Sequence, residues 1–149
     1  MPIAISSDLI NLSSENKTEE IANIISKKLK SNDVVFLYGE MGVGKTTFVK
    51  YLINKLQLKF DNKIVEVTSP TFNIMNEYYL GDFVIKHYDL YRLKSDDELK
   101  ELNLFENDND DIIFIEWPEI IKKKPSSVIK LYFEYKNDFK ERFLKVLYK

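Results

Sequence analysis

A short glycine-rich segment carries the clearest chemical signal in this sequence. Residues 39–46 read Gly-Glu-Met-Gly-Val-Gly-Lys-Thr, a complete Walker A pattern with four residues between its first and last glycines. In such a loop the glycines let backbone N–H groups approach phosphates, and the start of the following helix adds partial positive charge. Lys45 would place its charge beside the β and γ oxygens, while the Thr46 hydroxyl would ligate magnesium. The segment therefore predicts a site for ATP with Mg²⁺.

Magnesium in a P-loop also needs a carboxylate, ordinarily at the end of a neighbouring apolar strand. Two acids meet this condition. Glu116 follows the apolar run Ile112–Ile115, and Asp89 ends the strand-like segment Phe83–Tyr88. The alternative for each is an ordinary strand-end carboxylate that faces solvent. Both are therefore candidate metal ligands.

Such a loop works only between a strand and a helix, and the flanking sequence predicts both. The continuous apolar run Val34–Tyr38 ends at Gly39 and is typical of a parallel strand that is covered on both faces. After the glycines, apolar side chains recur with helical spacing at Phe48, Leu52, Ile53 and Leu56. The order strand, glycine loop, helix is the context that the Walker A pattern requires.

The remaining elements indicate an α/β domain with a mixed sheet. Apolar periodicity predicts a helix over Thr18–Lys30, and a capping box at Ser95–Glu98 opens a short helix. Apolar runs bounded by turn signals predict the strands. These are a hairpin of Phe72–Tyr79 and Phe83–Asp89 around Leu80–Asp82, a buried strand at Ile112–Ile115, and a closing hairpin of Val128–Tyr135 and Phe139–Tyr148 around Lys136–Asp138.

Composition limits the possible functions. With 149 residues, 44% hydrophobic and 13% aromatic, the chain fits one domain over residues 1–149. A net charge of −2 and a pI near 5.5 give no global positive field, so we expect any RNA to be engaged only indirectly. The absence of cysteine excludes disulfides and thiolate chemistry. The start lacks a signal-peptide pattern and no apolar run approaches the roughly 18 residues of a membrane span, so we expect a cytoplasmic protein.

Four segments, the P-loop and three others, together resemble the TsaE (also YjeE) family. In chain order they are Gly39–Thr47, Thr68–Phe72, His87–Arg92 and Ile115–Pro118. This is a bacterial ATPase family needed to make threonylcarbamoyladenosine in tRNA. The resemblance implies a three-layer P-loop NTPase-like fold whose mostly parallel central sheet has antiparallel flanking strands. It also implies a slow ATPase that acts on a complex of the two related partner proteins of bacterial threonylcarbamoyl transfer, with tRNA engaged only through them and no membrane involved.

The resemblance implies roles for individual residues as well. The phosphates would be bound by the loop and the start of its helix, namely Met41, Gly42, Val43, Gly44, Lys45, Thr46 and Thr47. Thr46 and Glu116 would hold magnesium, and Asp89 would be the acid near the γ-phosphate. Thr71 would be a mobile switch residue. With Lys45, the residues Asp89, Glu116 and Thr71 form the implied catalytic set.

Towards the two ends of the chain the resemblance is looser. Glu15 and Thr18 correspond to an N-terminal stretch that lies beside the adenine in the family. Val43 stands where alanine or serine is common, a mild departure because this position works through its backbone. The C-terminal part, including Arg142, matches only vaguely, and no nucleotide contact is assigned to it.

Four other features are interpreted as structural or left open. His87, the only histidine, is expected to face away from Tyr88 and to pack or to cap a polar network, with a role as general base as the alternative. Trp117 is either a core aromatic or an exposed contact for a partner or a substrate. The acidic run Asn107–Asp111 lacks the glycine and glutamate of a calcium loop and is interpreted as a solvated turn. The run Lys122–Lys124 is interpreted as exposed surface rather than as an RNA contact.

Other nucleotide-dependent functions remain as alternatives. A small-molecule kinase shares the P-loop but typically closes arginine-bearing lids over the phosphates, whereas this chain has only Arg92 and Arg142. A non-hydrolysing nucleotide switch would act through partner binding alone. A regulatory GTPase is disfavoured because no Asn-Lys-x-Asp guanine-reading element is present.

Overall fold

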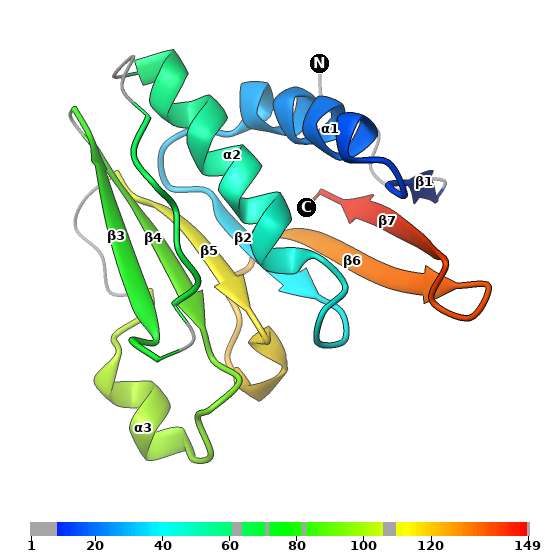
Figure 1. Ribbon diagram of the computed structural model, residues 1–149. Coiled ribbons are helices and arrows are strands. Elements are labelled where there is room, and N and C mark those ends of the chain that lie inside the picture. Colours follow the sequence, from blue (N-terminus) through cyan, green and yellow to red (C-terminus); the bar gives the residue numbers. More distant parts are fainter. Residues whose placement is uncertain (1–8, 61–63, 71, 82, 106–109, 149) are drawn as a thin grey trace.

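The computed structural model describes residues 9–60, 64–70, 72–81, 83–105 and 110–148 (Figure 1). Along the chain the elements are β1 (Ile10–Asn11), α1 (Glu15–Lys28), β2 (Val34–Tyr38), α2 (Lys45–Phe60), β3 (Met75–Leu80), β4 (Phe83–Asp89), α3 (Asp96–Glu101), β5 (Ile112–Glu116), the 3-10 helix η1 (Pro118–Ile120), β6 (Ile129–Lys136) and β7 (Glu141–Leu147).

The seven strands form one sheet in the order β1-β7-β6-β2-β5-β4-β3 (Figure 1). Its four central strands, β6, β2, β5 and β4, run parallel to one another. The flanking strands β3, β7 and β1 pair antiparallel with their neighbours. This confirms the predicted α/β fold, with a mostly parallel centre and antiparallel flanks.

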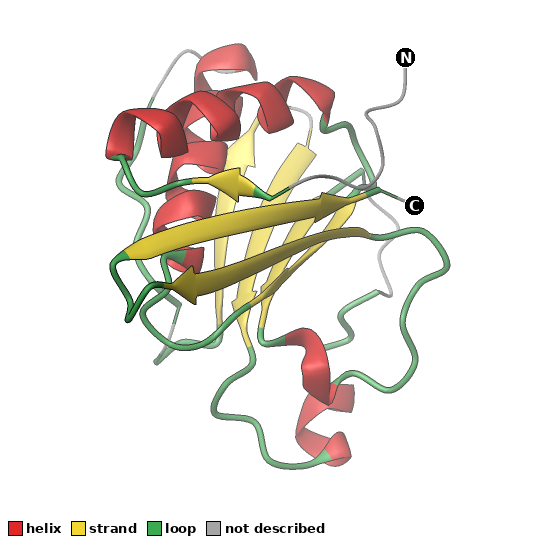
Figure 2. Cartoon of the chain, turned by 90° about the vertical axis from the view of Figure 1, so that its right-hand side faces the viewer, coloured by secondary structure: helices red, strands yellow, loops and turns green. Residues whose placement is uncertain are grey.

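Both faces of the sheet are covered, which gives the expected three layers. The helices α1 and α2 lie on one face (Figure 1). Val35 and Leu37 of β2 belong to the core on that face. Phe36, which lies between these two residues, points to the opposite face, where Leu104 and Ile121 contribute to a second core. That face is covered by α3, η1 and their connections, and Figure 2 shows the two short helices gathered near the ends of the central strands. A β2 buried on both sides explains its unbroken apolar sequence.

The helix boundaries follow the capping residues. Ser14 caps α1 by accepting a hydrogen bond from the Lys17 backbone N–H at 3.1 Å, so this helix begins at Glu15 rather than at the predicted Thr18. Ser95 caps α3 as predicted. In the part of the chain that the structure describes, no helix is both long enough and apolar enough to cross a membrane.

Every predicted strand is present with its ends within two residues of the prediction, except that one boundary lies farther away and one edge strand was missed. β3 begins at Met75 rather than at Phe72, because the backbone turns at Ile74, where φ is 69° and the N–H donates to the Pro70 carbonyl at 2.7 Å. The closing hairpin of β6 and β7 is confirmed, and three consecutive positive φ angles at residues 137–139 turn the chain. The edge strand β1 was not predicted, since its two residues are too few for a periodic pattern.

Candidate functional site

The glycine loop leaves β2, passes close to β6 and enters α2 at Lys45. Its backbone has φ angles of 149° at Gly39 and 106° at Gly44, which L side chains rarely adopt. A Cβ on Gly39 would lie 2.9 Å from the Val43 side chain and 3.0 Å from the Phe133 carbonyl oxygen. The glycines are therefore required both by the backbone angles and by the close packing of the loop on β6.

Lys45 is folded into the site rather than extended into solvent. Lys45 is only 4% exposed. Its Nζ donates a hydrogen bond to the Gly39 carbonyl and lies 3.6 Å from the centre of the Trp117 ring. Burial lowers the pKa of the Lys45 ammonium below its usual value, while nearby carboxylates, Glu116 foremost, act in the opposite direction. The positive charge thus rests over its own loop, against an aromatic face.

Thr46 and Glu116 meet at the start of α2. The Thr46 Oγ1 lies 2.9 Å from both carboxylate oxygens of Glu116 and donates to them. Parallel pairing of β2 with β5 sets this contact, because it aligns Leu37 with Glu116 just before β2 gives way to the loop. Glu116 is only 2% exposed, so it does not face solvent. The structure therefore brings together the two predicted magnesium ligands.

The other candidate acid lies one strand farther along the sheet. Asp89 is the register partner of Glu116 across β4 and β5 and is 7% exposed. Its Oδ1 accepts a hydrogen bond from the Tyr91 backbone N–H at 3.0 Å. His87, on the same face of β4 as Asp89, is fully buried, and its Nε2 lies 2.6 Å from the Glu116 Oε2. This confirms that His87 belongs to a polar network.

Lys45, Thr46, Asp89 and Glu116 line a cavity of about 300 Å³. Its residues come from the loop and α2 (Met41, Gly42, Gly44, Lys45, Thr46 and Thr47) and from the ends of β4 and β5 (Asp89, Tyr91, Glu116 and Trp117). Among the described residues, there is no group of three or more aspartate, glutamate, histidine or cysteine side chains that could hold a metal ion. Magnesium commonly takes one or two protein oxygens and completes its shell with phosphates and water. The hydroxyl and carboxylate donors at the start of α2 fit that requirement.

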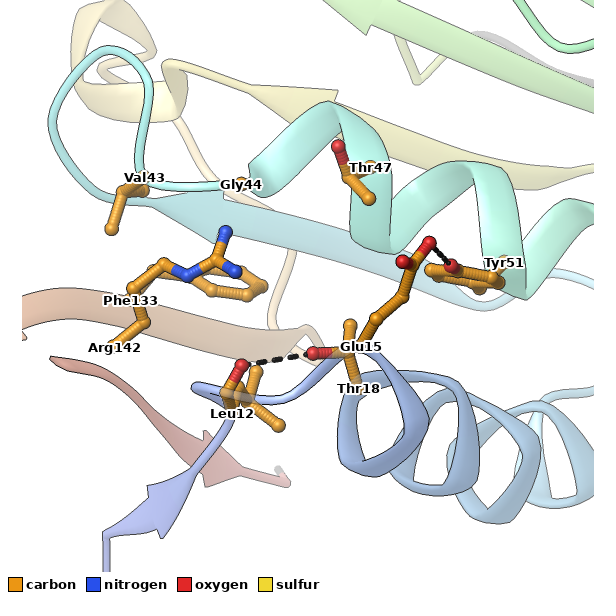
Figure 3. A pocket seen from close by; sticks show the side chains of 9 residues that line it. All are labelled: Leu12, Glu15, Thr18, Val43, Gly44, Thr47, Tyr51, Phe133 and Arg142. Atoms are coloured by element: carbon orange, nitrogen blue, oxygen red, sulfur yellow. Dashed lines mark hydrogen bonds between the residues drawn. The ribbon is translucent and has the colours of Figure 1, made fainter. Parts of the chain in front are cut away.

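A second, smaller cavity of about 110 Å³ (Figure 3) adjoins the first, because Gly44 and Thr47 line both. The nine residues that line it are Leu12, Glu15, Thr18, Val43, Gly44, Thr47, Tyr51, Phe133 and Arg142. Predicted adenine-side residues Glu15 and Thr18 thus lie in a hollow next to the phosphate loop. A nucleotide could span both cavities across the first turn of α2.

The smaller cavity is built from α1, α2 and the last two strands. The Tyr51 hydroxyl donates to Glu15, and this hydrogen bond raises the pKa of Tyr51 to about 12 (Figure 3). The Thr18 hydroxyl donates to the Leu12 carbonyl at 3.0 Å. Arg142 reaches from β7 towards the loop, and a Cβ on Gly44 would lie 3.1 Å from its Nη1. One guanidinium and one carboxylate therefore flank this cavity.

Several lining residues carried no recognisable sequence signal. Tyr51 and Phe133 look like ordinary apolar-face aromatics of a helix and a strand, and they join the cavity only through the tertiary fold. Arg142, one of two arginines in the chain, was noted in the sequence, but no nucleotide contact was assigned to it. Trp117 is neither a core aromatic nor a fully exposed contact, since it is partly buried against Lys45. Thr71 lies outside the described residues.

A family model and individual relatives from other organisms identify the same family for this chain. The family model for "Threonylcarbamoyl adenosine biosynthesis protein TsaE" matches residues 12–143. A relative from Rickettsia conorii, a tRNA threonylcarbamoyladenosine biosynthesis protein TsaE, is 44% identical over 111 residues, which are 74% of this chain and 61% of the relative. The chain thus covers less than two thirds of that protein. A relative of the same name from Aquifex aeolicus is 36% identical over 118 residues, covering 79% of this chain and 80% of the relative.

A solved structure shows a similar fold. The crystal structure of YdiB from Bacillus subtilis superposes with a TM-score of 0.72, covering 99% of this chain and 88% of that chain. The two sequences are 24% identical, so the likeness concerns the fold alone.

Proposed function

The chain belongs to the TsaE family of threonylcarbamoyl adenosine biosynthesis proteins, and from this premise we propose that it binds ATP with magnesium and hydrolyses it slowly, in the cytoplasm, to support that tRNA modification. The phosphates would lie in the larger cavity and the adenosine in the smaller one. The contact of Thr46 with Glu116 carries the proposal, because it unites the hydroxyl and the carboxylate that a magnesium nucleotide needs.

Binding of the phosphates requires one rearrangement of Lys45. In the structure its ammonium is occupied by the Gly39 carbonyl and the Trp117 ring. A phosphate oxygen is a stronger acceptor than a carbonyl, since both partners of the new hydrogen bond are charged. The flexible lysine stem can therefore swing to the β and γ oxygens, while backbone N–H groups of the loop and the first turn of α2 bind the same phosphates.

The ends of β4 and β5 supply the acidic residues of the proposed reaction. Magnesium held by Thr46 and Glu116 would neutralise part of the charge on the phosphates. Asp89, the register partner of Glu116, would orient the water that attacks the γ-phosphate. Thr71 keeps its proposed role as a switch residue on the strength of the family resemblance.

The proposed hydrolysis should be slow in the isolated chain. Efficient P-loop hydrolases usually place an arginine on the transferring phosphate, either from the same chain or from a partner. Here Arg92 packs against the Phe72 ring, with its guanidinium carbon 4.5 Å from the ring centre, and Arg142 lines the smaller cavity. Neither lines the larger cavity. We therefore propose that hydrolysis becomes productive on a complex of the two related proteins of threonylcarbamoyl transfer, which contact tRNA.

A reconstituted mixture tests this proposal. ATP turnover and tRNA modification would be measured with this chain omitted, added, or carrying Asp89→Asn or Thr71→Ala. We expect slow turnover by the isolated chain, faster turnover with the partner complex, and repeated rounds of modification only when the wild-type chain is present. Full turnover by the isolated chain, or transfer of the γ-phosphate to a small-molecule acceptor, would contradict the proposal and favour a kinase. Binding of ATP without any turnover would favour a nucleotide switch.

A further inference from the structure

His87 is buried at the back of the candidate metal site. It is the only histidine in the chain, its side chain is fully buried, and it sits on β4 two residues before Asp89. Its Nε2 lies 2.6 Å from the Glu116 Oε2. Since an ionised carboxylate can only accept hydrogen bonds, Nε2 carries the proton in this contact.

Few hydrogen-bond donors among the described residues contact the Glu116 carboxylate. A carboxylate that is 2% exposed has lost most of its hydration, and such a group is tolerated when protein donors replace the water. Among the described residues, Thr46 donates to both of its oxygens and His87 donates to Oε2. In the proposed function the Thr46 hydroxyl becomes a metal ligand. Among the described side chains, His87 then still donates a hydrogen bond to Glu116, on the side away from the metal.

The imidazole of His87 serves no other polar contact in the described chain. Its Nδ1 is buried and has no hydrogen-bond partner among the described residues. Burying an unpaired polar nitrogen costs free energy, and a hydrocarbon side chain would avoid that cost. The bond to Glu116 is therefore what a histidine adds at this position that a leucine would not.

From this geometry we propose that His87 is a positioning residue, which fixes the Glu116 carboxylate towards Thr46 and so sets the affinity of the site for Mg²⁺ with nucleotide. This inference rests on the proposed function, because it assumes that Glu116 holds the metal. A buried donor behind a ligating group restricts its rotation, and loss of such a donor typically lowers metal affinity about 10- to 100-fold.

Two amide substitutions separate positioning from packing. His87→Gln keeps an N–H donor at about the reach of Nε2, whereas the shorter His87→Asn withdraws its amide to about the position of Nδ1. Tyr88→Phe serves as the control, because Tyr88 is buried on the same strand but points into the opposite core. Binding of ADP and of a non-hydrolysable ATP analogue would be titrated calorimetrically, once with Mg²⁺ varied and once in EDTA.

We expect His87→Asn to weaken Mg²⁺ binding about tenfold in the presence of nucleotide, with little change in EDTA. His87→Gln should retain most of the wild-type Mg²⁺ affinity, and Tyr88→Phe should leave the Mg²⁺ affinity unchanged. The effect of His87→Asn should disappear in a Glu116→Gln background, because residues that act through one contact are not additive. Equal losses with and without Mg²⁺, or the same loss in the Glu116→Gln background, would overturn the inference.

The same titrations separate failure of this inference from failure of the proposed function. If Glu116→Gln alone leaves the Mg²⁺ dependence unchanged, the proposed metal ligand is wrong and the role of His87 falls with it. If Glu116→Gln abolishes the Mg²⁺ dependence but His87→Asn does not alter it, the metal site stands and only the positioning role is wrong. Thermal unfolding of each variant without nucleotide gives a second readout. His87→Asn should lower Tm more than the same change made in Glu116→Gln.

Discussion

The two adjoining cavities hold their polar groups in different ways. In the larger cavity Glu116 and Asp89 are nearly inaccessible to solvent and are held at the ends of the parallel strands β5 and β4. In the smaller cavity the hydrogen bond between Glu15 and Tyr51 joins exposed surfaces of α1 and α2. Buried groups on strand ends cannot shift without disturbing the core, whereas side chains on helix surfaces can.

From this difference we expect the two cavities of the proposed site to bind different parts of the nucleotide. The preorganised cavity suits the phosphates and the metal, where small displacements alter chemistry. The adaptable cavity would suit the adenosine, which would contribute affinity and selectivity. Substitutions in the first cavity should therefore distinguish ATP from ADP or alter the response to Mg²⁺, while substitutions in the second should act on all adenine nucleotides alike.

The largest effect is expected from Lys45→Ala. The lysine would contact both β and γ oxygens, and each hydrogen bond between charged groups contributes about 1.5–3 kcal/mol, so ATP affinity should fall about 100-fold or more. Calorimetric titration of the folded variant measures this. Lys50→Ala, an exposed lysine on the same helix, is the control and should bind ATP normally. Unchanged ATP affinity in a folded Lys45→Ala protein would falsify the P-loop assignment.

Next in size is the effect of Glu116→Gln. The amide keeps the shape of the side chain but removes the charge that would hold the ion, so Mg²⁺ affinity in the presence of nucleotide should fall about 10- to 100-fold, or ~1.4–3 kcal/mol. Binding in EDTA should change little. Glu119→Gln is a suitable control, because Glu119 is an exposed neighbour on η1 that does not line the cavity. An unaltered Mg²⁺ dependence would transfer the ligand role to Asp89.

The contrast between the cavities also marks how far the sequence could be interpreted. The larger cavity was predictable because its residues occur in contiguous motifs, and parallel strands bring their carboxyl ends to one edge of the sheet. Gly44, Thr46, Asp89 and Glu116 all lie there as expected. The sheet itself was predictable from the apolar runs, since strands buried on both faces have an unmistakable composition.

The smaller cavity was predictable only in part. Glu15 and Thr18 came from the family resemblance and not from any local pattern. Tyr51 and Arg142 face this cavity because α2 packs on α1 and β7 pairs with β6, and the cavity brings residues of α1 and α2 together with a residue of β7, which is far from them in the chain. No spacing along the sequence encodes such a juxtaposition. The same limit applies to His87, whose role depends on the register of β4 with β5.

A smaller effect is expected from Arg142→Ala. The guanidinium lies beside Gly44 and away from the acids of the larger cavity, so it should contribute to nucleotide binding without sensing the γ-phosphate. ATP and ADP affinities should fall together by about three- to tenfold, the equivalent of ~0.7–1.4 kcal/mol for a partly exposed charged contact. Arg92→Ala removes the other arginine, which lines neither cavity, and should leave both affinities unchanged. A loss of affinity confined to ATP would place Arg142 at the γ-phosphate. It would contradict the assignment of the phosphates to the larger cavity and of the adenosine to the smaller one.

The smallest effect, and the finest test of the adaptable cavity, is expected from Glu15→Gln. A carboxylate can accept a hydrogen bond from the 6-amino group of adenine but repels the O6 of guanine, whereas an amide can donate to that oxygen. The preference for ATP over GTP should therefore decrease about two- to threefold, since an exposed hydrogen bond contributes about 0.5 kcal/mol or slightly more. Competition of GTP against labelled ATP measures the ratio. Glu19→Gln is the matched control on the same helix, because Glu19 pairs with Lys55 at 3.0 Å and does not line the cavity. An identical change in both variants would mean that the effect comes from net charge on α1, and the adenine would then have to be sought elsewhere.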